Sequence, residues 1–157
     1  MMDKNEAVIE YLMRCPVIQS NPLFFNFADV ENGNNHFITE SDKTKKSYVD
    51  GSALKHYTFT IACYKSVAHN AIIGSSNFND ENIENMAIVQ SILDWLDEQA
   101  DKHEYPDFGE NCLIDSMKTL SADPDLDGID TSVNPPIARY SVGVRIQYID
   151  NTKRIWN

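Results

Sequence analysis

Two stretches of the sequence place large apolar residues at every second position, and this pattern constrains the fold more than any other feature. The first runs from Tyr57 to Lys65 and the second from Arg139 to Ile149. Successive side chains of a strand point to opposite sides, so each stretch predicts a strand with one buried face. Those faces would carry Tyr57, Phe59, Ile61 and Cys63 in the first strand, and Tyr140, Val142, Val144, Ile146 and Tyr148 in the second.

Two segments have the 3.6-residue apolar spacing of amphipathic helices. The first, Asp3 to Met13, would end before Cys15-Pro16, because proline cannot continue a helix. The second would begin at an Asn79 or Asp80 cap and continue beyond Leu96. Its apolar line would cover one face of a sheet and consists of Met86, Val89, Leu93 and Leu96, widened by Ile92 and Trp95.

Three further segments predict strands. Leu23–Val30 is rich in aromatic residues, and the Asn32-Gly33 pair that follows it is typical of a tight turn into a second strand, His36–Ser41. Cys112–Leu120 alternates less regularly.

The order of these elements and their half-polar strands predict an α+β fold. We expect a four- to five-stranded, mostly antiparallel sheet with two helices packed on one face. Parallel strands are usually buried on both faces, whereas the strands expected here each have a polar face. The length of 157 residues fits a single domain, residues 1–157.

Two polar segments are candidates for contacts with other molecules. The sequence predicts a long mobile loop from Asp42 to His56, with an Asp50-Gly51 turn inside it. The other is the C-terminal tail, which is unusually apolar. The possible oligomer or partner contacts in these two segments are Lys43, Lys45, Lys46, Lys55, Ile155 and Trp156.

Charge is unevenly distributed and disfavours several classes of protein. The net charge is −11, and residues 80–130 contain 15 acidic and 2 basic side chains. An acidic chain is unsuited to non-specific nucleic-acid binding, which requires concentrated positive charge. No segment is apolar enough for a membrane helix, and the acidic N-terminus does not resemble a secretion signal. Three cysteines without metal-like spacing favour a reduced, intracellular protein.

The stretch DPDLDGIDTSVN matches the first half of a calcium-binding loop. Asp123, Asp125 and Asp127 have the required spacing and Gly128 occupies the turn position. Position twelve, where a bidentate glutamate is expected, is Asn134, and no helix flanks the segment. We therefore interpret 123–130 as an acidic turn, with a small calcium- or ligand-binding module as an alternative.

No pattern in the sequence indicates catalysis, a cofactor or a metal centre. The histidines occur singly, and His56 and Cys63 would lie on opposite faces of a continuous strand. The chain contains no nucleophile elbow and no glycine-rich phosphate loop. The sequence therefore favours a protein that is not an enzyme.

The chain as a whole resembles a family of phage proteins. The motifs LFFNF, YVDGSALKHYTFTI, PDFGENCLID, DGIDTSV and IDNTKRIW are similar to those of minor capsid or minor tail proteins of tailed phages and prophages of Gram-positive bacteria. Some members carry the label "chloramphenicol resistance protein", which would imply an acyltransferase. The motifs are structural, so the resemblance supplies no catalytic residues.

The resemblance implies a structural protein of virion assembly. The order of elements is similar to that of tail terminators, which form a ring at the end of the tail tube, a hexamer by analogy. The expected partners are then other copies of the chain, the tail-tube protein and head-completion proteins, with no specific nucleic acid and no membrane. The expected location is the host cytoplasm during assembly and afterwards the virion. The lysine-rich segment and the Ile155-Trp156 tail would contact a neighbouring copy or the tube.

Overall fold

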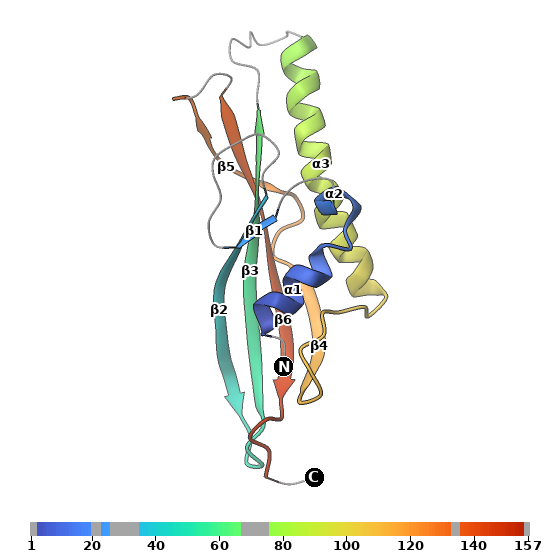
Figure 1. Ribbon diagram of the computed structural model, residues 1–157, viewed down its shortest axis with the longest axis vertical. Coiled ribbons are helices and arrows are strands. Elements are labelled where there is room, and N and C mark those ends of the chain that lie inside the picture. The colour runs from blue at the N-terminus through green and yellow to red at the C-terminus, as the bar shows by residue number, and fades with distance from the viewer. Residues whose placement is uncertain (1–2, 20–22, 26–34, 67–75, 133–135, 156–157) are drawn as a thin grey trace.

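The computed structural model describes residues 3–19, 23–25, 35–66, 76–132 and 136–155. They form an elongated molecule in which a twisted sheet carries helices on one face (Figure 1). The strands are β1 (Leu23–Phe25), β2 (Asn35–Ser47), β3 (Ala53–Ser66), β4 (Cys112–Thr119), β5 (Asp125–Asp130) and β6 (Ile137–Asp150). The sheet has the order β1-β2-β3-β6-β4, and β5 also pairs with β6. All pairings except β1–β2 are antiparallel. The predicted α+β class is confirmed.

The two alternating stretches form strands, as predicted, and these strands, β3 and β6, lie at the centre of the sheet. β3 and β6 pair without interruption from Ala53↔Asp150 to Ser66↔Ile137. Their apolar positions face the helices and are almost completely buried. On the other face Thr60 and Arg145 are partly exposed, whereas Thr58, Ala62, Tyr64 and Ser141 are buried there as well, so that face is open only in part.

Three helices cover one face of the sheet: α1 (Lys4–Leu12), α2 (Pro16–Gln19) and α3 (Ser76–Asp101). Asp3 caps α1 by accepting a hydrogen bond from the Asn5 backbone N–H. α2 begins at Pro16, so the proline that was expected only to end a helix also starts one. None of the helices in the described part of the chain is long and apolar enough to cross a membrane.

α3 is the long helix that the apolar spacing predicted, and its buried line includes Val89, Ile92, Leu93 and Leu96. The predicted start is wrong. The helix begins at Ser76, so Asn79 and Asp80 lie within it instead of capping it. Caps are hard to place from sequence when several polar residues, here Ser76 to Asp80, precede the apolar line.

The prediction of a long mobile loop over Asp42–His56 is also wrong. β2 continues to Ser47 and β3 already begins at Ala53, so the two strands form a long hairpin arm. The turn itself is where Asp50-Gly51 predicted it: the Tyr48 N–H bonds to the Ser52 carbonyl, and Gly51 has a positive φ of 90°. The backbone pairing holds this arm in place, although most of its side chains are polar.

The acidic segment is a strand and not a turn. β5 pairs with the N-terminal part of β6, from Asp125↔Ser141 to Asp130↔Ile137. β4 pairs with the C-terminal part of the same edge of β6. β4 and β5 therefore lie end to end along the same edge of β6. Between them, the Leu120 N–H donates a hydrogen bond to the Gly143 carbonyl of β6. Together they make the outer edge of the sheet opposite β2.

The first strand departs from the prediction as well. Within Leu23–Val30 the structure describes a strand only at β1, and residues 26–34, with the Asn32-Gly33 pair, lie outside the described residues. β1 pairs with β2 in parallel, Leu23↔Asn35, so the expected antiparallel hairpin between them is wrong.

Candidate functional site

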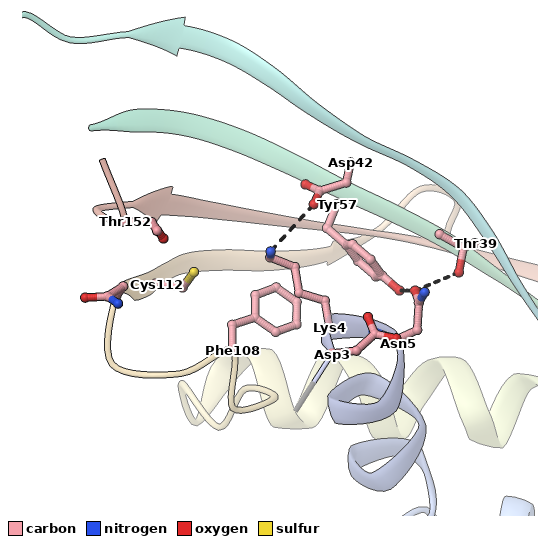
Figure 2. Close-up of a pocket in the computed structure, with 10 residues that line it drawn as sticks. Asp3, Lys4, Asn5, Thr39, Asp42, Tyr57, Phe108, Cys112 and Thr152 are labelled. Carbon is pink, nitrogen blue, oxygen red and sulfur yellow. Dashed lines mark hydrogen bonds and ion pairs between the residues drawn. The ribbon is translucent and has the colours of Figure 1, made fainter. Parts of the chain in front are cut away.

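A polar cleft of about 370 Å³ opens where the N-terminal end of α1 meets the sheet (Figure 2). α1 supplies its first residues, β2 and β3 supply the wall beneath, and the segments around β4 and the C-terminus close the sides. Its lining residues are Asp3, Lys4, Asn5, Thr39, Asp42, Tyr57, Phe108, Asn111, Cys112 and Thr152.

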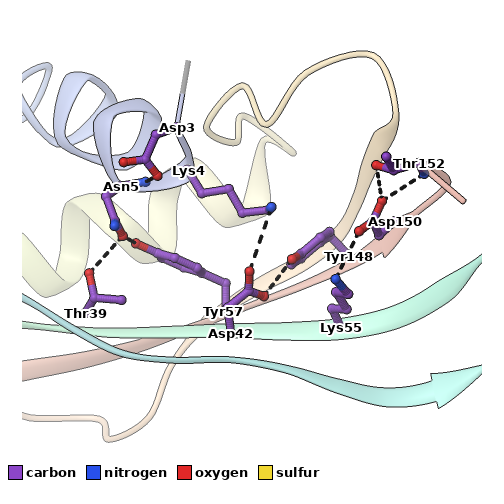
Figure 3. A network of polar contacts seen from close by, with 10 residues as sticks. All are labelled: Asp3, Lys4, Asn5, Thr39, Asp42, Lys55, Tyr57, Tyr148, Asp150 and Thr152. Atoms are coloured by element: carbon purple, nitrogen blue, oxygen red, sulfur yellow. Dashed lines mark hydrogen bonds and ion pairs between the residues drawn. The ribbon is translucent and has the colours of Figure 1, made fainter. Parts of the chain in front are cut away.

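Internal hydrogen bonds hold the polar groups of this cleft (Figure 3). The Asn5 side-chain oxygen accepts hydrogen bonds from the Thr39 hydroxyl, at 2.8 Å, and from the Tyr57 hydroxyl. The Asp42 carboxylate accepts a hydrogen bond from the Tyr148 hydroxyl at 2.6 Å and lies 3.8 Å from the Lys4 ammonium. These contacts tie α1 to β2, β3 and β6.

The groups that could act as nucleophiles in the cleft are protonated at neutral pH. Burial raises the pKa of Tyr57 to about 12. Burial also raises the pKa of Tyr148, and the hydrogen bond to Asp42 adds to the shift. The pKa of the Cys112 thiol is likewise raised by burial. Thiolates are the reactive form of cysteine, so this environment does not activate Cys112. We interpret the cleft as a polar seam that fixes α1 on the sheet.

The other candidates for chemistry are scattered. His56 bonds to Gln147 and His103 to Tyr105, and neither lines the cleft; His69 lies outside the described residues. Cys63 is buried beneath the helices, and this burial raises its pKa to about 12. Among the residues that the structure describes, no group of three or more His, Cys, Asp or Glu side chains could hold a metal ion. In the extended β5, the carboxylates of 123–130 follow a strand instead of converging on one point.

The end of the hairpin arm and the C-terminal tail form one unit, which we call the hairpin tip (residues 43–50 and 153–155). The Ile155 N–H donates to the Asp50 carbonyl at 2.6 Å, and the Arg154 guanidinium lies 3.1 Å from the Asp50 carboxylate. A side chain at Gly51 would collide with the Lys153 carbonyl, so glycine permits the tail to pack closely. The two segments proposed for contacts are therefore adjacent, although about a hundred residues separate them in sequence.

The hairpin tip exposes large apolar side chains next to positive charge. Val49 is 86% exposed and Ile155 70% exposed. Tyr48 is partly exposed, with the Lys46 ammonium 5.5 Å from its ring centre. Large apolar side chains gathered at one end of a molecule mark an interaction site.

The residues predicted for contacts differ in their environments. Lys43, Lys45 and Lys46 are exposed and form no ion pair with a described residue. Lys55, in contrast, is bound within the molecule, 3.0 Å from the Asp150 carboxylate. Trp156 lies outside the described residues.

The Lys55–Asp150 pair gives a prediction for the stability of the arm. Burial acts to raise the pKa of Asp150, but hydrogen bonds from Thr152 and the ion pair with Lys55 outweigh it and lower the pKa to about 2. Replacing Asp150 by asparagine is expected to cost about 1–2 kcal/mol at neutral pH. A depressed pKa stabilises the fold above the unfolded-state value of 3.8, and this contribution is lost as the pH falls through about 2.

Thermal unfolding of the wild type and Asp150→Asn from pH 7 to pH 2 would measure the effect. The two melting temperatures should converge as the pH falls from about 4 to about 2. Asp107→Asn, an exposed carboxylate outside this ion pair, is the control. A constant difference at all pH values would contradict the assignment.

The second exposed surface lies at the opposite end of the sheet and is called here the acidic edge (Asp123–Asp130). Its side chains include exposed Leu126, at 52%, and Ile129, at 50%. A groove of about 290 Å³ runs beside it on the face away from the helices. Tyr64 and Ile137 line this groove, with Asp127 and Asp130 also lining it. The sequence predicted a turn for this segment, and a turn gives no indication of the groove.

Comparison with known proteins leaves the family open: no family model matches the chain, and no curated protein matches it.

Proposed function

We propose that the protein is a structural component of virion assembly that works by self-association, as a tail terminator forming a ring at the end of a tail tube. The observation that carries the proposal is the separation of two exposed apolar surfaces of opposite charge, the hairpin tip and the acidic edge. A closed ring requires two different surfaces that fit each other on successive copies. The acidic chain also suits a ring through which DNA passes without being retained.

The arrangement of the sheet supports the same proposal. Within the described residues, the outer side of β4 and β5 pairs with no further strand. Open edges present unpaired backbone groups and are sites where another chain can add. Meanwhile the polar groups of the cleft bond to one another, which leaves shape and surface contacts as the means of action.

Electron micrographs of phage particles assembled without this gene would test the proposal. Tails of uncontrolled length, or heads that cannot join finished tails, are the expected result. Supplying the wild-type protein to such extracts should restore joining. Particles of normal length and normal joining would contradict the proposal, whatever the protein does alone in solution.

A further inference from the structure

The side chains of the hairpin tip are complementary to a surface that is acidic and partly apolar. Its segments contain the basic residues Lys43, Lys45, Lys46, Lys153 and Arg154, against the single acidic residue Asp50. Asp50 is already paired with Arg154. Val49 projects at the turn and is the most exposed large apolar side chain described. The tip therefore presents the exposed apolar side chain of Val49 beside several positively charged side chains.

The acidic edge has the opposite chemistry. It contains Asp123, Asp125, Asp127 and Asp130 and no basic residue. Leu126 and Ile129 are half exposed between these carboxylates, and the neighbouring groove is open. Arg139 is 3.8 Å from Asp127, but both side chains remain more than a third exposed, so this ion pair neutralises little of the edge.

We propose that the hairpin tip of one copy docks on the acidic edge of the next copy. In this contact Val49 and Tyr48 pack against Ile129 and the groove that it lines, while the lysines of the tip meet the carboxylates. This inference rests on the proposed function, because it names the contact through which copies would join into a ring. Opposite charge guides the encounter and the apolar residues supply most of the binding energy.

The positions of the two surfaces decide the kind of assembly. The tip adjoins the end of β6 at Asp150, and Ile129 pairs with Ala138 near its start. Twelve strand residues separate these levels, which corresponds to about 40 Å. The two surfaces lie at opposite ends of the molecule (Figure 1). The contact is therefore head to tail, and each copy retains one unused tip and one unused edge until the assembly closes.

Two sets of variants separate the surfaces. Lys45→Glu/Lys46→Glu disables the tip and keeps the edge, and Asp125→Lys/Asp127→Lys disables the edge and keeps the tip. Sedimentation of the wild type at up to about 1 mM is expected to show association that weakens at least about tenfold between low and high salt. Each variant alone should associate at least about tenfold more weakly than the wild type.

Mixing the two variants provides the decisive measurement. A head-to-tail contact predicts that mixing restores association between unlike copies, because the intact tip of one variant fits the intact edge of the other and the charge-reversed tip faces a charge-reversed edge. If the edge variant self-associates normally, the contact is tip to tip and the inference is wrong. Failure of the mixture to form any dimer also overturns it.

Two further variants test whether a change in net charge or a loss of folding explains weaker association. Lys102→Glu/Lys118→Glu changes the net charge by the same amount at exposed positions outside the tip and should associate like the wild type. Val49→Asp, at a side chain that contributes nothing to the core, should lose association with an unchanged melting temperature. A monomeric wild type at every concentration and salt overturns the inference, while the micrographs of particles lacking the gene still decide the proposed function separately.

Discussion

Replacing Phe59 by alanine is expected to lower the free energy of unfolding by about 3–5 kcal/mol. Phe59 lies in β3, at the centre of the sheet, and is completely buried. Its ring packs between those of Phe37, 5.2 Å away, and Tyr57, 5.9 Å away. Truncation would remove these ring contacts and leave a cavity that rigid strands on both sides prevent from closing.

Urea denaturation monitored by circular dichroism would measure this change, through a shifted midpoint at constant slope. Leu113→Ala is the matched control, because this leucine of β4 is 64% exposed and its truncation should change stability by less than about 0.5 kcal/mol. Similar effects of the two substitutions would contradict the burial described for Phe59.

Truncating Tyr148 to alanine is expected to destabilise the protein by about 3–5 kcal/mol, whereas Tyr148→Phe should cost only about 1 kcal/mol. The ring is fully buried and meets Phe108 edge to face at 5.3 Å. The Lys4 ammonium lies 5.5 Å from the ring centre. The hydroxyl adds the hydrogen bond to Asp42. The phenylalanine variant would remove this bond and keep the ring, whereas the alanine variant would remove both.

The difference between the two variants separates packing from hydrogen bonding at the seam. Calorimetric melting curves of both would be measured, and Tyr148→Phe, Asp42→Asn and their double variant would form a cycle for the Tyr148–Asp42 bond. Equal losses in Tyr148→Phe and Tyr148→Ala would show that the hydroxyl dominates and that the packing described for the ring is wrong.

The two central strands could be predicted from the sequence because a strand with one buried face carries large apolar residues at every second position. Tyr57 to Cys63 and Tyr140 to Tyr148 show this period, and they form the uninterrupted β3–β6 pair. α3 was likewise recognisable from Val89 to Leu96, where one side of the helix is covered. In α3 and in β6 from Gly143 onward, one side is more open than the other, and this difference produces the periodicity; β3 is buried on both faces from Ile61 to Lys65, and only its large apolar side chains show the period.

The hairpin arm could not be predicted in the same way. From Asp42 to Ser47 every side chain of β2 is exposed, so neither face imposes a pattern. The strand is held by backbone hydrogen bonds to β3, which any residue except proline can form. Only the Asp50-Gly51 turn left a signal, because it requires a positive φ.

β5 was not predicted because its residues favour a turn, whereas those of the hairpin arm favour no particular structure. Asp-Gly sequences favour turns, yet Gly128 pairs with Arg139 inside the sheet, next to a bulge. β4 pairs with β6 only as far as Val144, so the N-terminal part of this edge of β6 is left for β5. Pairing there outweighs the local preference of the β5 residues for a turn. The candidate contacts at Lys43 to Lys46 and Ile155 followed from composition, but that they share one end of the molecule required the fold.

The position of β6 has a consequence for how the protein is made. It follows β3, β4 and β5 in the sequence and pairs with all three of them. On the ribosome, the three earlier strands must therefore wait for their common partner, and their unpaired edges are exposed to other nascent chains in the meantime. Synthesis through Asp150 is thus the step that commits the polypeptide to its native form.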